Sequence, residues 1–171
     1  MEEADNREFC DLLEKEIPRF DAVILVDYGH SLFTPEAIEL ICGSSNFLAL
    51  NAQSNAGNLG FQSITRYARA DYVAMSEWEM RLDVRDRGGD LRDVVRRLSD
   101  RLECPRIIVT QGSQGCSCFE SGTGFFHVPA FAGQVVDRVG AGDAFLSVTS
   151  LCVAQNAPME VAGFIGNVVG A

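Results

Sequence analysis

Short apolar runs alternate with segments of helical periodicity along this chain, and this alternation constrains the fold more than any other feature. A continuous apolar run such as 22–27 is typical of a parallel strand that is covered on both faces. A helix is expected after it, because Thr34 and Pro35 form an N-cap and N1 pair. We expect strands at 22–27, 47–51, 71–75, 106–110, 116–119 and 125–128, and helices at 5–17, 34–41 (stopping at Gly43), from Ser76, 90–102, 141–154 and 158–171. Strands that alternate with helices predict a layered α/β domain with a mostly parallel sheet.

Length and charge narrow the class of protein. The 171 residues correspond to about one domain, 1–171, and no linker marks a boundary within them. The chain carries 24 acidic and 14 basic residues, a net charge of -10, so its surface repels nucleic acids and anionic membranes. Neither is therefore expected as a partner. The negative charge does not exclude a nucleotide as a ligand, because Mg²⁺ and clustered N–H donors can overcome the repulsion from the protein's overall negative field.

The six cysteines indicate a reducing compartment, because they form no CxxC pair and four lie in apolar segments. A cytoplasmic location is expected. Cys116 and Cys118 should share one face of a strand, where a metal pair is conceivable. The chain offers only two histidines, His30 and His127, and a structural zinc site usually has four ligands, which disfavours that interpretation.

The Gly140-Ala141-Gly142-Asp143 stretch stands directly before a long apolar helix. Glycines there leave the first backbone N–H groups of the helix accessible, which makes an anion site. A carboxylate in this position would repel a bound phosphate, but it can remove a proton from a hydroxyl that attacks phosphorus. The alternative is an ordinary glycine turn in which Asp143 complements the helix dipole. The stretch alone does not decide between the two.

The longer segment 137–145, DRVGAGDAF, resembles the signature of the ribokinase-like (PfkB) carbohydrate kinases. Segments 26–30, 109–115 and 162–167 resemble three further family motifs in the right order, and 27–30 with 51–53 is most similar to the heptose-kinase-like branch. The resemblance implies a three-layer α/β/α ribokinase-like, Rossmann-like fold. It also implies transfer of a phosphoryl group from ATP, with Mg²⁺, to a hydroxyl of a sugar or sugar-like molecule.

The resemblance also implies residue roles. Asp143 would be the general base, and the N–H groups of Gly140, Ala141 and Gly142 would form the anion hole. Asp27 would lie on the substrate side. Nucleotide-binding roles fall on Thr110, Gly112, Gly115 and Asn167, and Asp137 corresponds to a position that some relatives use for a monovalent cation.

Two positions depart from the family pattern. Ser76-x-x-Glu79 replaces Asn-x-x-Glu, so Glu79 either organises Mg²⁺ through water or completes a helix capping box. His30 stands where a lysine is common in the family. A neutral imidazole would stabilise the negative charge of a phosphate less than an ammonium group does.

The family's substrate-gripping N-terminal half has no counterpart before Asp27, and the last helix runs apolar to Ala171. We therefore expect a C-terminal catalytic part that is inactive alone, with self-association or a missing N-terminal half supplying the partner of its first strand. The rival function is a non-catalytic nucleotide-binding or scaffolding module, which would not need Asp143 for turnover. A dinucleotide-binding Rossmann enzyme is set aside, because no GxGxxG follows the first strand.

Overall fold

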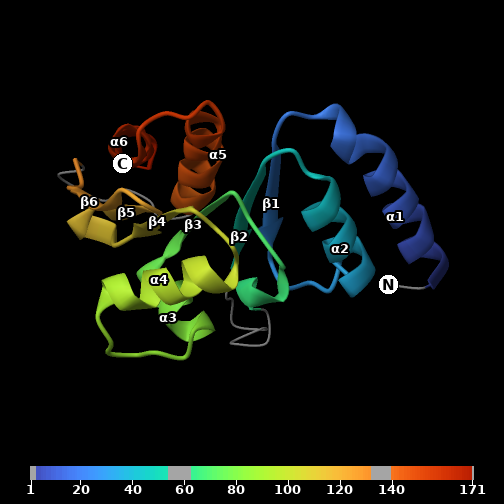
Figure 1. Ribbon diagram of the computed structural model, residues 1–171, viewed down its shortest axis with the longest axis horizontal. Coiled ribbons are helices and arrows are strands. Elements are labelled where there is room, and N and C mark those ends of the chain that lie inside the picture. The colour runs from blue at the N-terminus through green and yellow to red at the C-terminus, as the bar shows by residue number, and fades with distance from the viewer. Residues whose placement is uncertain (1–2, 54–62, 132–139, 171) are drawn as a thin grey trace.

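The computed structural model describes residues 3–53, 63–131 and 140–170 and contains one six-stranded sheet (Figure 1). The strands lie in sequence order and are β1 (Val23–Asp27), β2 (Leu48–Ala52), β3 (Tyr72–Ser76), β4 (Arg106–Thr110), β5 (Cys116–Glu120) and β6 (Gly124–Val128). β1 to β4 are parallel, and β5 and β6 continue the sheet as an antiparallel hairpin. The predicted mostly parallel α/β sheet is confirmed.

Helices cover both faces of this sheet and make three layers. One face carries α2 (Pro35–Ser44), α3 (Glu77–Asp83) and α4 (Leu91–Arg101), with α1 (Glu3–Glu16) packed on α2. The other face carries α5 (Ala141–Ala154) and α6 (Met159–Val169), which appear above the sheet in Figure 1. In the described part of the chain, short 3₁₀ turns span Ile17–Arg19, Ile64–Arg66 and Gly112–Gln114. Alternate residues along each strand enter the two cores, because successive side chains point to opposite faces.

Capping residues start the helices where the sequence predicts. The Thr34 hydroxyl accepts from Ala37 N at 3.3 Å, and Asp90 accepts from Arg92 N at 2.8 Å. Ser76 and Glu79 form a complete capping box at the start of α3. The predicted stop of the second helix is wrong, because α2 continues through Gly43 to Ser44 and closes with Ser45 N bonded to Ile41 O at 3.2 Å.

The expectation that the first strand is covered on both faces is wrong for the described residues. β1 lies at the end of the sheet and pairs with β2 alone among the strands described. Leu25 is buried on the α2 side, whereas Ile24, on the opposite face, is 37% exposed. The reason is the position of α5, which packs on β3 rather than on β1. Among the described residues, no helix is long and apolar enough to span a membrane.

Candidate active site

A cavity of about 240 Å³ lies where the carboxyl ends of β2, β3 and β4 meet the N-terminus of α5. Asn51, Ser76 and Thr110 line it from the strands, and Glu79 and Asp143 line it from the helices. This edge is where parallel α/β sheets commonly bind ligands, because strand ends and helix N-termini converge there. The structure thus brings together Asp143, Gly140, Gly142, Glu79 and Thr110, five of the residues predicted from the sequence.

The start of α5 has the geometry of an anion site. Gly140 precedes the helix in a left-handed conformation, with φ 80° and ψ -9°. The first helical hydrogen bond runs from Ala144 N to Gly140 O at 2.9 Å, so the N–H groups of Ala141, Gly142 and Asp143 lie before it. A Cβ added at Gly140 or Gly142 would meet nothing within 4 Å. The cavity that Gly140 and Gly142 line and the helix dipole both favour an anion at this helix end.

Asp143 is held by two side chains from distant parts of the chain. Gln53 Nε2 donates to its Oδ1 at 2.8 Å, and the Tyr28 hydroxyl donates to its Oδ2 at 3.2 Å. Partial burial of the ring, the charge of Asp143 and this hydrogen bond raise the pKa of Tyr28 above its ordinary value. Sequence reasoning missed both contacts. The available signal was that each residue follows a parallel strand, since such strand ends meet at one edge of the sheet.

Asp27 lies beside this site but does not line the cavity. It is 2% exposed at the end of β1, and it accepts hydrogen bonds from Tyr67 Oη at 2.8 Å and Gly29 N at 2.9 Å. Arg66 Nη1 approaches the same carboxylate at 3.6 Å. Burial and the charge of Asp27 raise the pKa of Tyr67 well above its ordinary value. In this structure Asp27 fixes the backbone that carries Tyr28.

Oxygen ligands suited to Mg²⁺ line one wall of the cavity. Glu79 Oε2 accepts from Ser76 N at 3.0 Å and from Ser76 Oγ at 2.6 Å, so Glu79 both caps α3 and faces the cavity. Asn51 Nδ2 donates to Ala74 O at 2.7 Å. Asn51 Oδ1 is buried, and no group in the described part of the chain hydrogen-bonds to it. A buried acceptor that needs a donor, beside two carboxylates, fits a hydrated Mg²⁺ ion, since that ion prefers oxygen ligands and keeps waters.

This donor set is not a closed metal centre. Within residues 3–53, 63–131 and 140–170, no three His, Cys, Asp or Glu side chains are placed together to hold a metal ion. Asp137 lies outside the described residues. His30 is exposed, and its ring stacks on Tyr28 with centroids 6.5 Å apart, away from the cavity lining.

The predicted nucleotide residues are divided between two places. Thr110, at the end of β4, lines the cavity, and Gly112 and Gly115 shape the 3₁₀ turn after it with φ values of 57° and 93°. Asn167 does not line the cavity. Its Nδ2 donates to Val128 O at 3.1 Å and to Pro129 O at 3.0 Å, which ties α6 to the end of β6.

The cysteines behave as packing residues. All six are free, and each of them except Cys152 is buried. Cys116 and Cys118 share one face of β5, with Sγ atoms 4.0 Å apart, under α6. The expected free thiols are confirmed.

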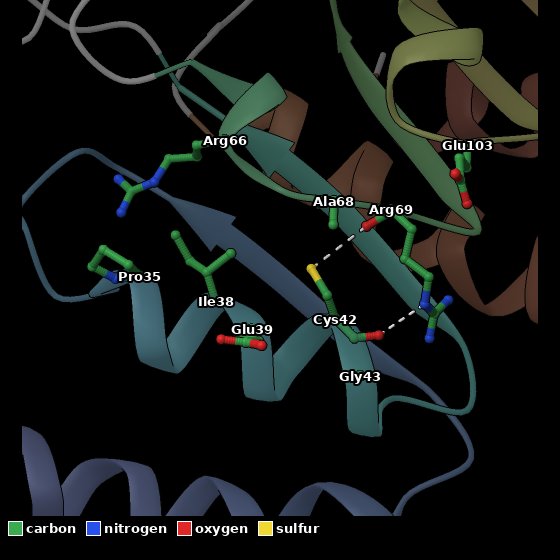
Figure 2. Close-up of a pocket in the computed structure, with 9 residues that line it drawn as sticks. All are labelled: Pro35, Ile38, Glu39, Cys42, Gly43, Arg66, Ala68, Arg69 and Glu103. Atoms are coloured by element: carbon green, nitrogen blue, oxygen red, sulfur yellow. Dashed lines mark hydrogen bonds between the residues drawn. The ribbon is translucent and has the colours of Figure 1, made fainter.

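A second, wider hollow of about 730 Å³ lies between α2 and the segment at 66–69 (Figure 2). Figure 2 shows the Arg69 side chain reaching toward the C-terminal part of α2, where Nε donates to Cys42 O at 2.8 Å. Arg69 Nη1 also pairs with Asp71 Oδ2 at 2.7 Å. These bonds join α2 to the start of β3, so this arginine has a structural role.

Comparison with known proteins identifies the family. Residues 29–171 match the profile described as "pfkB family carbohydrate kinase". The "Bifunctional protein HldE" of Geotalea uraniireducens is 27% identical over 163 residues, which cover 92% of this chain and 32% of that protein. The protein of the same name from Citrifermentans bemidjiense is 27% identical over 170 residues, covering 96% and 34%. The chain thus spans about a third of the length of these relatives.

Solved structures show the same fold. Escherichia coli phosphofructokinase-2 in complex with potassium superposes with a TM-score of 0.81 at 16% identity, covering 99% of this chain and 55% of that one. Arabidopsis thaliana ribokinase complexed with ribose and ATP gives a TM-score of 0.71 at 16% identity, covering 94% and 51%. The ribokinase-like fold expected from the sequence is confirmed, and the chain belongs to the pfkB family of carbohydrate kinases.

Proposed function

We propose that this chain forms the nucleotide-binding and catalytic part of a kinase that transfers the γ-phosphoryl group of ATP to a hydroxyl of a sugar or sugar-like substrate. The observation that carries the proposal is the Asp143 carboxylate in the first turn of α5, beside a cavity that Gly140 and Gly142 at the start of the same helix also line. The family membership and the fold support the same reaction class.

In the proposed reaction Asp143 accepts the proton of the acceptor hydroxyl while that oxygen bonds to the γ-phosphorus. The bond from the γ-phosphorus to the bridging oxygen breaks, and ADP leaves with the electron pair. The N–H groups of Gly140, Ala141 and Gly142 stabilise the charge on the migrating phosphoryl group, as preorganised donors do in other anion holes. Phosphoryl transfer asks mainly for positioning and charge stabilisation, and these residues can supply both.

Bound Mg²⁺ would neutralise charge on the nucleotide phosphates. Glu79, acting through water, and Asn51 Oδ1 are the residues proposed to hold its hydration shell, because they present oxygen to the cavity. Thr110, Gly112 and Gly115 are proposed to contact the nucleotide phosphates. Asn167 is proposed to contribute beside the adenine by holding the chain at 128–129.

The proposal has three further parts: a monovalent cation, a cellular location and the partners. A monovalent cation near Asp137 is proposed, and the potassium complex of phosphofructokinase-2 supports it. A cytoplasmic location is proposed because the six thiols are free. The proposed partners are ATP and a sugar-like molecule rather than nucleic acid or membrane, because the net charge is -10.

The alternative is a non-catalytic nucleotide-binding or scaffolding module. The observation that favours it is that both carboxylate oxygens of Asp143 already accept hydrogen bonds from the protein. The alternative predicts that ATP binds and that no acceptor is phosphorylated.

The test is ADP formation by the full-length natural polypeptide with ATP and Mg²⁺ over a panel of ribose, fructose 6-phosphate and heptose phosphates. We expect turnover with at least one acceptor. Asp143→Asn should lower kcat by roughly 10²-fold or more, because the proton acceptor is lost. Its affinity for ATP, measured by calorimetry, should stay within about two-fold of wild type or improve, because a charge that repels phosphate is removed.

Asp93→Asn is the matched control, because its side chain is 71% exposed on α4, away from the cavity. It should keep wild-type kcat. Asp143→Asn protein that retains most of the wild-type kcat would contradict the base assignment. ATP binding without turnover on any acceptor would instead favour the non-catalytic module.

A further inference from the structure

We propose that Tyr28 and Gln53 are positioning residues that hold the Asp143 carboxylate in the orientation needed to accept the acceptor proton. This inference rests on the proposed function and deepens it. It is carried by two hydrogen bonds to the Asp143 carboxylate. Their donors, Tyr28 and Gln53, lie 115 and 90 positions before Asp143 in the chain.

The sheet brings the two donors side by side. Tyr28 directly follows β1 and Gln53 directly follows β2, and Asp27 and Ala52 are partners in the parallel pairing. Gln53 N continues this ladder by donating to Asp27 O at 2.9 Å. The two side chains therefore leave adjacent strand ends and reach the first turn of α5 together.

The two bonds leave the base able to work. A carboxylate offers about four lone-pair sites, and one donor on each oxygen occupies two of them. A donor on each oxygen also restrains rotation of the carboxylate about its Cβ–Cγ bond. Both donors are neutral, so they orient Asp143 without placing a positive charge beside the anion that must take a proton. Orientation matters because small displacements of a catalytic group can lower the rate by up to about 10²-fold.

The protein also fixes the donor that lies nearer the surface. Tyr28 is 42% exposed, so packing alone does not determine where its hydroxyl lies. Buried Asp27 next to it binds both Tyr67 Oη and Gly29 N, which restrains the backbone on either side of Tyr28. Gly29 has a φ of 75°, a turn conformation that favours glycine. Through this turn, Asp27 contributes to the site without lining the cavity.

Removing each donor without changing side-chain shape gives the first test. In the full-length protein, with the acceptor that turns over fastest in the panel above, Tyr28→Phe and Gln53→Met should each lower kcat about 10-fold. The KM for ATP should stay within about two-fold, because neither side chain is assigned to the nucleotide. Tyr72→Phe is the matched control, since it removes a buried hydroxyl bonded to Thr149 of the same helix at 2.8 Å. It should lower the melting temperature and leave kcat near wild type.

Two further measurements separate positioning from a general structural effect. Adding Tyr28→Phe to Asp143→Asn should lower kcat little beyond Asp143→Asn alone, because the hydroxyl acts through the carboxylate. In a pH titration, the phenolate absorbance of Tyr28 is obtained by subtracting the spectrum of the protein that carries Tyr28→Phe from that of the protein with Tyr28. This absorbance should appear at lower pH when the subtraction is made in the Asp143→Asn background than in the wild-type background. The reason is that Asp143 raises the pKa of Tyr28.

The results of these experiments separate a failure of the positioning role from a failure of the proposed function. If Asp143→Asn loses turnover while Tyr28→Phe and Gln53→Met keep full kcat, the positioning role is overturned and the kinase assignment stands. Additive effects of Tyr28→Phe and Asp143→Asn would also overturn it. If Asp143→Asn keeps turnover, the base assignment and the positioning role both fail while the kinase activity stands, and the titration still shows whether the tyrosine–carboxylate contact exists.

Discussion

At the residue scale, the two glycines before and within α5 have different tasks. Gly140 adopts a left-handed φ of 80°, whereas Gly142 is helical. A sequence pattern of glycine, small residue, glycine treats them alike. Position 140 needs a left-handed conformation, in which any residue other than glycine would be strained. Gly142 has an ordinary helical conformation, so a side chain there would affect only what binds beside its N–H.

This difference predicts opposite effects of the same substitution. Gly140→Ala should lower the free energy of unfolding by about 1–2 kcal/mol, because alanine is strained in the left-handed region. Gly142→Ala should keep or raise it by up to about 1 kcal/mol, because alanine favours a helix over glycine. Urea unfolding of the two variants measures both values. Equal destabilisation would contradict the assigned conformations.

The anion site itself is tested by a bulkier side chain at Gly142. Gly142→Val should leave the circular dichroism spectrum near wild type, since a Cβ there meets nothing within 4 Å. It should abolish the rise in melting temperature that ATP causes in wild type, because the branched side chain crowds the bound phosphate. An unchanged ATP-induced shift would favour an ordinary structural turn.

At the element scale, the turn after β4 is joined to β6 by a close backbone approach. A Cβ at Gly115 would lie 2.1 Å from Val128 O and 2.6 Å from Ala130 N, and the φ of Gly115 is 93°. Gly115→Ala should therefore destabilise the protein by about 3 kcal/mol or more, since rigid backbone must shift. Gly122→Ala is the control, because Gly122 has a similar φ of 85° in open space. It should cost only about 1 kcal/mol in thermal or urea unfolding.

A second element-scale prediction concerns the end of α3. Asp83 accepts from Ile64 N at 2.6 Å, and burial raises the pKa of its carboxyl. The folded protein therefore holds this proton more tightly than the unfolded chain. Protonation stabilises the fold, and this contribution is lost as the pH rises through the folded-state pKa.

Asp83→Asn should consequently melt above wild type at neutral pH, because the buried charge is removed while the acceptor for Ile64 N is kept. The difference should shrink as the pH is lowered toward the ordinary carboxyl range near about 4. Thermal melts at several pH values measure it, with Asp93→Asn as the exposed control. A difference that stays constant with pH would contradict the burial argument.

At the scale of the whole molecule, the sheet of the described residues ends in an apolar strand. β1 pairs only with β2 among the described strands, and Ile24 is 37% exposed on it. An unpaired apolar strand edge is a template for pairing with another chain. The net charge of -10 opposes close association but is screened by salt.

We therefore expect the 171-residue chain alone to self-associate and to show no sugar kinase activity. Size-exclusion chromatography with light scattering measures the first, and the acceptor panel measures the second. Ile24→Lys should shift the population toward monomer, because an edge lysine blocks strand pairing. A wild-type monomer that phosphorylates a sugar would contradict both expectations.

The sequence by itself determined the kinds of element and their order, because apolar periodicity and capping are local properties. Thr34, Ser76 and Asp90 begin helices as predicted, while the stop at Gly43 failed because a glycine outside the left-handed region does not end a helix. The 140–143 stretch and the order of the motifs were enough to place the chain in its family.

Tertiary structure alone decided how the site is assembled. The bonds of Tyr28 and Gln53 to Asp143, the burial of Asp27 and the exposed face of β1 depend on which strands are neighbours and where α5 packs. Contacts across 115 or 90 positions leave no local pattern, since any polar side chain at a strand end could have made them. Only the register of β1 on β2 and the packing of α5 on β3 selected these two.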